Sequence, residues 1–318
     1  MVSSRFKTSV ICCFFVFPTG SLNADFAGSS KTLSETVLSD IRLSKSVSSK
    51  SMVEEIDRII GSATEKYVSE TFVGLDVSIE GIVDGDPIIG MSGLKVLDET
   101  DDLSKTTFVQ GSIYSQDGRH TFNAGLGHRL VSENKKWMWG VNVFYDHEFP
   151  YDHQRVSLGT EFVTSIAEFN ANRYLGLSDW RTGKGGYAEK ALDGEDFEIG
   201  LAIPYMPQSK VYHKEFRWVG VSGRQDLEGY TTSVKIAGDL FIKGLSVELG
   251  QTSFKNNKES IDHVKVTYSQ QKAEEPSRPL FSSMAFQFDS VEKQRTRKVR
   301  RENLIVKQTR TKVIFRGE

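Results

Sequence analysis

Residues 121–162 read TFNAGLGHRLVSENKKWMWGVNVFYDHEFPYDHQRVSLGTEF, and the middle of this stretch decides the fold class. From 137 onward every second side chain is large and apolar, and the positions between carry mainly small or polar groups. The apolar series is Trp137, Trp139, Val141, Val143 and Tyr145, and the other face includes Gly140, Asn142 and Asp146. Successive side chains of a β-strand point to opposite faces, so the pattern predicts a strand with one apolar and one polar face.

The same alternation recurs on both sides of this strand, from about Thr71 to about Ser269, in stretches of roughly 9–12 residues. It predicts an all-β chain with twelve strands, at 72–80, 88–97, 106–115, 120–131, 136–147, 154–165, 168–176, 195–205, 210–219, 228–239, 243–254 and 262–270. Met284, Phe286 and Phe288 hint at a thirteenth strand, but single-chain bacterial barrels have even strand numbers. We therefore assign these three residues to a segment that follows the barrel.

A soluble β-sandwich alternates in the same way, so other features must separate it from a membrane barrel. The polar face is rich in glycine, asparagine, serine and charge, as a hydrated lumen requires. Aromatic residues cluster at strand ends, with Trp137 at one end of its strand and Tyr145, Phe149 and Tyr151 toward the other. At a tilt near 40° this strand spans roughly 20 Å, close to the apolar band between the aromatic girdles of outer-membrane barrels. We therefore predict a twelve-stranded antiparallel transmembrane barrel in the bacterial outer membrane.

Composition narrows the alternatives. The chain has 318 residues with 40 basic and 42 acidic side chains, a balance that argues against nucleic-acid binding. Only 38% of the residues are hydrophobic, and beyond about the first twenty positions no uncharged apolar run is long enough for a membrane-spanning helix.

Residues 1–24 are predicted to form a secretory signal peptide. Its elements are Arg5 and Lys7, the apolar run 10–17, and Leu22 and Ala24 at the −3 and −1 positions of a cleavage site. Both cysteines, Cys12 and Cys13, fall inside this segment. The mature chain would therefore have no disulfide and no cysteine metal site.

Residues 25–69 are predicted to be a periplasmic segment with a short amphipathic helix. Ser51 and Glu54 have the spacing of a capping box, and apolar residues at 52, 56, 59, 60 and 63 share one helical face. A loosely ordered tether is the alternative for this segment. The predicted barrel covers 70–272, and the post-barrel segment covers 273–318.

The connections predict how the barrel is oriented. If the first strand starts in the periplasm, the longest connection, 178–195, is extracellular, and short ones such as 132–135 and 206–209 are periplasmic. Long outer loops and short inner turns are typical of bacterial barrels.

Several motifs that keep one register resemble the inverse autotransporter β-domain, the intimin/invasin family. They are GLGHR at 125–129, W-x-W-G-x-N-x-F-Y-D at 137–146, LSDW at 177–180, and His153, Arg155, Leu158, Gly159 and Glu161 between the last two. The resemblance covers roughly 65–310 and includes RKVRRENLIVKQ at 297–308, which is similar to the family's post-barrel motif. It implies a twelve-stranded outer-membrane barrel whose chain turns back through the pore after the last strand and leads a passenger to the cell surface.

Charge supports a post-barrel segment that threads the pore. Its candidate pore residues are Arg297, Arg300, Arg301 and Asn303, with Arg295 and Lys298 as further cations. Lumen carboxylates that can pair with these cations are Asp76, Glu161, Glu198 and Glu248. A solvated basic tail is the alternative interpretation.

The chain also departs from the family's pattern. About ten residues follow Gln308, too few for an immunoglobulin-like module, and no peptidoglycan-binding module is evident before the first strand. We therefore expect an outer-membrane anchor and translocation domain that lacks a passenger in this chain. The resemblance implies outer-membrane lipid, periplasmic chaperones and the barrel-assembly machinery as partners, and a homodimer stays open. A plugged or open channel with a structural or transport role is the alternative function.

An outer-membrane enzyme is the rival to these non-catalytic functions. Asp146, His147, Asp152 and His153 lie near one another in the sequence and suggest an Asp/His pair that activates water. However, His153 belongs to the motif of a non-enzymatic family, and the two histidines lack a third ligand at a zinc-like spacing. We therefore predict no enzyme activity, no metal and no cofactor.

Overall fold

The computed structural model describes residues 74–81, 87–237, 243–255, 260–269 and 279–310, and the backbone of 313–314. All the described residues belong to one compact unit of the chain. The predicted signal peptide and the predicted helix around 51–63 lie outside the described residues. Within the described ranges, no helix is both long and apolar enough to cross a membrane.

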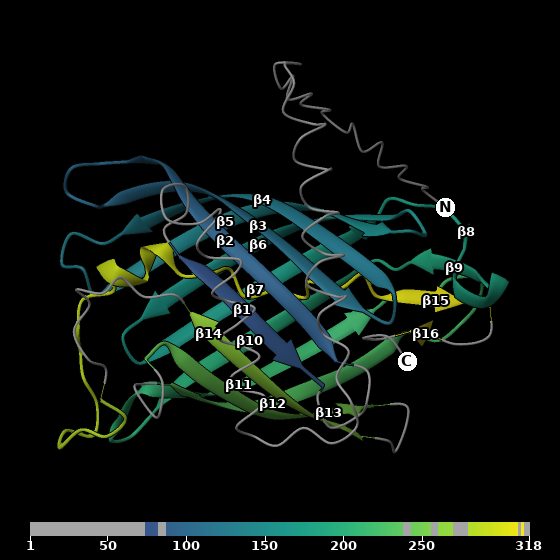
Figure 1. The fold of residues 1–318 in the computed structure, drawn as a ribbon. Helices are drawn as coiled ribbons and strands as arrows, with labels where there is room; N and C mark the ends of the chain where they lie inside the picture. The colour runs from purple at the N-terminus through teal and green to yellow at the C-terminus, as the bar shows by residue number, and fades with distance from the viewer. Residues whose placement is uncertain are drawn as a thin grey trace, which may run out of the picture. The chain divides into compact units, whose positions relative to one another are not determined.

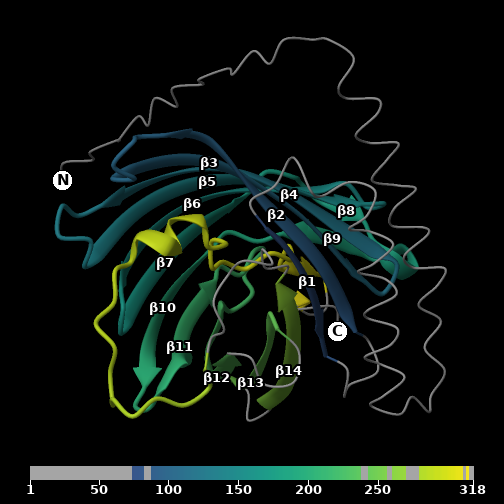
Figure 2. The same ribbon diagram turned by 60° about the vertical axis from the view of Figure 1, so that its left-hand side comes forward.

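Twelve strands form a closed antiparallel barrel (Figures 1 and 2). They are β1 (Leu75–Glu80), β2 (Ile88–Glu99), β3 (Lys105–Gln116), β4 (Arg119–Val131), β5 (Trp137–Phe149), β6 (His153–Thr164), β7 (Ala167–Gly176), β10 (Gly194–Ile203), β11 (Met206–Trp218), β12 (Leu227–Ala237), β13 (Leu245–Phe254) and β14 (Ser260–Ser269). Because β1 pairs with both β2 and β14, the sheet has no free edge, which is the condition for a sheet to cross lipid. The prediction of a twelve-stranded antiparallel barrel is confirmed.

Side-chain exposure alternates along the strands. In β5 the outward Trp137, Val141 and Val143 are 40%, 55% and 48% exposed, whereas Met138 and Asp146 are buried. Exposed apolar side chains in such number are unfavourable in water, and contact with lipid tails removes that cost. Polar and charged side chains therefore gather inside the barrel, where they can bind one another.

Two glycines of the GLGHR motif make room for aromatic rings in the lumen. A Cβ on Gly125 would overlap the ring of Phe144, and a Cβ on Gly127 would overlap the ring of Phe108. Both rings are buried, and together with Leu94 they form an apolar cluster. The motif thus follows from packing inside the barrel.

The two ends of the barrel carry different connections. We call the end where β1 begins and β14 ends the near end, which has the short turns 132–136 and 204–205. The opposite, far end has the connections 177–193 and 219–226. The first of these contains regular structure that the sequence pattern did not predict, namely β8 (Arg181–Thr182), the 3-10 helix η1 (Lys184–Gly186) and β9 (Ala188–Ala191).

The predicted turn at 206–209 is wrong. These residues open β11, and Met206 pairs with Ile203 across a tight turn at 204–205 after a register shift in β10. Prolines at 204 and 207 give this part of the chain the composition of a loop, which hid the start of the strand.

After β14 the described chain resumes at 279 and follows the near end of the barrel. The amide of Tyr205 in the β10–β11 turn donates to the carbonyl of Ala285 at 2.8 Å, and the amide of Ser282 donates to the carbonyl of Tyr205 at 2.9 Å. Residues 284–288 add no strand, in agreement with their assignment to a post-barrel segment.

The chain then crosses the inside of the barrel. It forms the 3-10 helix η2 (Glu292–Thr296), and at the far end β15 (Lys307–Thr309) joins β8, β9 and β16 (Val313–Ile314) in a sheet of order β16–β15–β9–β8. Figure 1 shows this segment in yellow, running from η2 to β15 within the ring of strands. We call residues 292–310 the tail.

Candidate functional site

The tail enters the barrel beside the β4–β5 turn. Val291, the residue before the tail, is buried against Val131, Met138 and Val163, and its amide donates to the carbonyl of Lys135 at 2.9 Å. An apolar contact and a backbone hydrogen bond thus fix the point of entry.

Arg129 of β4 holds the first inward part of the tail. Its guanidinium donates to the carbonyls of Arg295 and Arg297, at 2.6 and 2.7 Å, and to Glu161 at 2.6 Å. Glu99, at the near end of β2, accepts from Nε of Arg295 at 2.5 Å. The lumen therefore binds both the backbone and the side chains of the tail.

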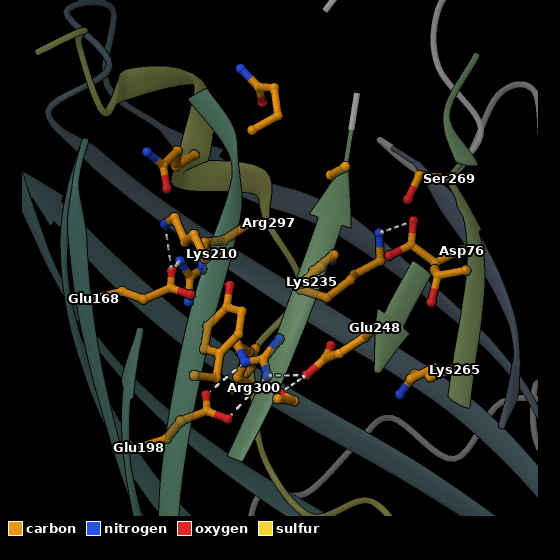
Figure 3. Close-up of a pocket in the computed structure, with 18 of the residues that line it drawn as sticks. Asp76, Glu168, Glu198, Lys210, Lys235, Glu248, Lys265, Ser269, Arg297 and Arg300 are labelled. Carbon is orange, nitrogen blue, oxygen red and sulfur yellow. Dashed lines mark hydrogen bonds and ion pairs between the residues drawn. The ribbon is translucent and has the colours of Figure 1, made fainter. Parts of the chain in front are cut away.

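Arg297 binds the wall formed by β6 and β7. It forms an ion pair with Glu168, and its Nε lies 3.6 Å from Glu161. Lys210 of β11 reaches the same Glu168 oxygen at 3.2 Å, so this carboxylate joins the tail to two parts of the wall (Figure 3).

Arg300 binds the adjoining part of the wall, formed by β10, β11 and β13. It donates to both oxygens of Glu198, at 2.6 and 3.0 Å, and to Glu248 at 3.2 Å (Figure 3). Its guanidinium also lies over the ring of Tyr212, 3.7 Å from the ring centre. One tail side chain thus contacts β10, β11 and β13.

Arg301 is enclosed on the β5–β6 side. It donates to both oxygens of Asp146, at 2.8 and 2.6 Å, and Asp146 also accepts from Arg155 at 2.8 Å. The side chains of all three residues are fully buried. Charges without access to water are stable only when they are paired and hydrogen-bonded.

The remaining predicted pore residues also meet the wall. The side-chain nitrogen of Asn303 donates to the hydroxyl of Tyr114 at 3.1 Å, and the backbone carbonyl of Asn303 accepts from the side chain of Asn123 at 3.0 Å. Lys298 lies 3.7 Å from Asp76. Each of the four predicted lumen carboxylates therefore lies within 4 Å of a cation of the tail.

Sequence reasoning did not list Asp146 and Glu168 as lumen carboxylates, although both bind tail arginines. The alternation of each strand carried the necessary signal, because Asp146 follows the outward Tyr145 and Glu168 precedes the outward Phe169. Both therefore belong to the inward face.

A second charge cluster lies where the tail leaves the lumen. Lys307 pairs with Glu148, and Arg119 bridges Glu148 at 2.7 Å and Glu189 at 2.8 Å. His153 lies 3.3 Å from Glu189. Burial raises the pKa of Glu189, but hydrogen bonds from His153 and Arg119 outweigh this effect and hold that pKa at about 2.

This cluster has the ligand types of a metal site, but its negative charge is already neutralised by Arg119 and Lys307. One ligand atom each from Glu148, His153 and Glu189 lie within 4.8 Å of one another, as a three-ligand site requires. The two carboxylates already bind Arg119 and Lys307, so a metal ion would have to displace both cations. The arrangement fits an internal ion-pair network.

The four residues considered for catalysis do not form one cluster. Asp146 is buried in the lumen against two arginines, whereas His147 and Asp152 pair with each other at 2.8 Å. His153 faces Glu189 and the hydroxyl of Ser178 instead. Neighbours in the sequence are thus separated by the alternation of the strands.

The four predicted girdle residues have different surroundings. Trp137, Tyr145 and Phe149 are exposed on the outward face of β5. Tyr151 lies in the β5–β6 connection, half-buried, with the guanidinium of Arg119 4.4 Å from its ring centre. Three of the four therefore have the outward placement that a girdle needs.

The tail does not fill the lumen. A cavity of about 1360 Å³ remains beside it, toward β1 and β12–β14 (Figure 3). Polar and charged side chains line it, among them Asp76, Lys235, Glu248 and Lys265.

An apolar outer face, a charged lumen and a chain that crosses its own pore define an outer-membrane β-barrel of the translocator class. The family model described as "Inverse autotransporter, beta-domain" matches residues 29–303, and the chain belongs to this family. The protein is thus an outer-membrane translocator domain in contact with membrane lipid, and its family is not enzymatic.

Three relatives illustrate the family. The chain is 29% identical over 134 residues to "Invasin" of Yersinia enterocolitica, which covers 40% of this chain and 16% of that protein. It is 35% identical over 103 residues to "Putative attaching and effacing protein homolog" of Escherichia coli K12, covering 32% of this chain and 35% of that protein. It is 30% identical over 103 residues to "Inverse autotransporter adhesin YeeJ" of the same organism, covering 31% and 4%. The matches therefore span only 4% to 35% of these relatives' length.

The fold is also similar to that of a solved structure. A chain from work on the in-meso crystallisation of membrane proteins superimposes with a TM-score of 0.63 and 18% identity, covering 74% of this chain and 99% of that one. This likeness concerns the fold alone.

Proposed function

We propose that the far end of the barrel faces the cell exterior and that the tail is both guide and plug. It leads the polypeptide beyond Gln308 to the cell surface and closes the pore behind it. The observation that carries this proposal is the series of ion pairs along the tail, from Arg295–Glu99 through Arg300–Glu198 to Lys307–Glu148. A solvated basic tail would not meet a carboxylate at each step.

The connections support this orientation. The two longest connections between barrel strands, 177–193 and 219–226, lie at the far end, and bacterial barrels have their longer loops outside the cell. The described chain after β14 follows the near end, so it must cross the pore to reach the outside.

Membership of the family supports the remaining steps. We propose that residues 1–24 are a signal peptide, that 25–69 stay in the periplasm, and that periplasmic chaperones and the barrel-assembly machinery deliver the barrel. The cargo would be whatever polypeptide is joined to the tail.

An epitope tag after Glu318 tests the proposal. On intact cells, added protease should remove this tag, while a tag inserted in the 204–205 turn should be cut only after the outer membrane is broken. The opposite pattern would reverse the orientation and overturn the export role.

An open channel is the second candidate, and the cavity beside the tail favours it. Planar-bilayer recordings of the full chain separate the two functions. The plug predicts a small conductance with rare openings, and a large, steady conductance would establish a channel.

A further inference from the structure

The tail is held a second time outside the lumen, by two far-end connections that the export role does not require. Residues 177–193 and 219–226 both contact its segment 306–310. We call these two connections together the far-end clamp.

The first half of the clamp binds the tail as a strand. Antiparallel pairing joins Lys307, Gln308 and Thr309 of β15 to Ala191, Lys190 and Glu189 of β9. The amide of Leu192 extends this ladder to the carbonyl of Val306 at 3.0 Å. An added strand gains backbone hydrogen bonds along its length, as in known modes of peptide binding.

The second half binds one side chain. The side-chain oxygen of Gln308 accepts from the backbone nitrogen of Val221 at 3.0 Å, and its side-chain nitrogen donates to the carbonyl of Val221 at 3.1 Å. Gln308 is 1% exposed, so both bonds are shielded from water. The carbonyl of Arg310, two residues further along the tail, accepts from Arg224 at 2.6 Å.

An apolar anchor fixes the position of the segment. Val306 is buried among Tyr174, Leu192, Phe216 and Trp218, at the far end of the lumen. If the tail moved back toward the near end, Val306 would enter the charged lumen and Gln308 would lose both partners. Retreat is therefore opposed by the loss of apolar burial and of hydrogen bonds.

We infer that the far-end clamp is a binding site for the emerging segment 306–310 and prevents the exported chain from sliding back into the pore. The inference rests on the proposed orientation, and it goes beyond the ion pairs of the lumen. Those ion pairs hold the tail inside the pore, whereas the clamp opposes its movement back toward the near end.

The test records channel openings in planar bilayers with full-length variants. Gln308→Ala should raise the frequency of openings about tenfold, because two shielded hydrogen bonds are lost. Gln225→Ala is the matched control, since Gln225 is exposed in the 219–226 connection, and it should open as rarely as the parent. Equal frequencies in the two variants would overturn the clamp.

A reversible lock gives an independent arm. In a background with Cys12→Ser and Cys13→Ser, the register partners Lys190 and Gln308 are both replaced by cysteine. Oxidation should abolish openings, and reduction should restore them to the level of Gln308→Ala. If the pair does not form a disulfide in the folded barrel, or if oxidation leaves the openings unchanged, the inference fails.

The C-terminal tag separates this failure from failure of the export role. A surface-exposed tag together with insensitive openings would reject the clamp and leave the proposed function standing. A protected tag in the parent chain would reject the proposed function itself.

Discussion

Asp146 shows why the lumen depends on the tail at the level of single residues. Its carboxylate binds Arg155 of the wall and Arg301 of the tail, and none of the three side chains reaches solvent. Removing one member of such a group leaves a buried charge without its partner, which typically costs about 3–5 kcal/mol.

Asp146→Ala should therefore lower the free energy of unfolding by about 3–5 kcal/mol, measured by urea titration in lipid vesicles. The control is Glu195→Ala, which breaks the half-exposed pair with Arg173 and should cost less than about 1 kcal/mol. Similar losses for the two variants would show that Asp146 is not held as a buried ion pair.

The sequence predicted which side chains face the lumen, but it did not predict which of them form ion pairs with each other. The phase of alternation placed Glu198 and Glu248 in the lumen, and both bind Arg300. No local pattern could show that one arginine reaches two strands, because the meeting depends on strand register and on the path of the tail.

At the level of elements, a row of outward register partners runs across neighbouring strands, and all its members except the first are charged. Register partners in this row are Leu158, Arg173, Glu195, Arg217 and Glu228, in strand order β6, β7, β10, β11 and β12. Leu158 lies in the middle of β6, whereas the charged members lie close to the far ends of their strands. The change from leucine to charge thus marks where the apolar band ends.

Val143→Arg tests this boundary, since Val143 is the register partner of Leu158 and is exposed within the band. A cation on the lipid face near the middle of the bilayer should lower the free energy of unfolding by about 2–4 kcal/mol. Arg217→Leu, at the charged end of the row, should change it by less than about 1 kcal/mol. If Val143→Arg were neutral, the band would have to lie elsewhere on the barrel.

The short strands could not be predicted from the sequence, for a physical reason. β9 and β15 are too short to show a period, and each is defined by the other across more than a hundred residues. The twelve barrel strands are longer and have one face toward lipid, so their alternation was visible without any knowledge of their partners.

At the level of the whole molecule, the tail supplies much of the positive charge in the lumen. Arg297, Arg300 and Arg301 face Glu168, Glu198 and Asp146, and the cavity beside them already holds polar side chains that favour water. Removal of the tail would leave these carboxylates facing an open, hydrated pore. Rings of carboxylates are the usual basis of cation selectivity in pores.

Deletion of residues 290–318 should therefore raise the conductance and also shift the reversal potential in a KCl gradient toward that of a cation-selective pore. Replacement of Arg297, Arg300 and Arg301 by glutamine in the full chain should shift selectivity in the same direction with a smaller rise in conductance, since the backbone still occupies the lumen. Heat-dependent migration in gels would show that both variants fold as barrels. Preference for anions in the deletion variant would mean that the wall cations, such as Arg129 and Arg155, dominate the lumen, and the tail would then not be its main source of positive charge.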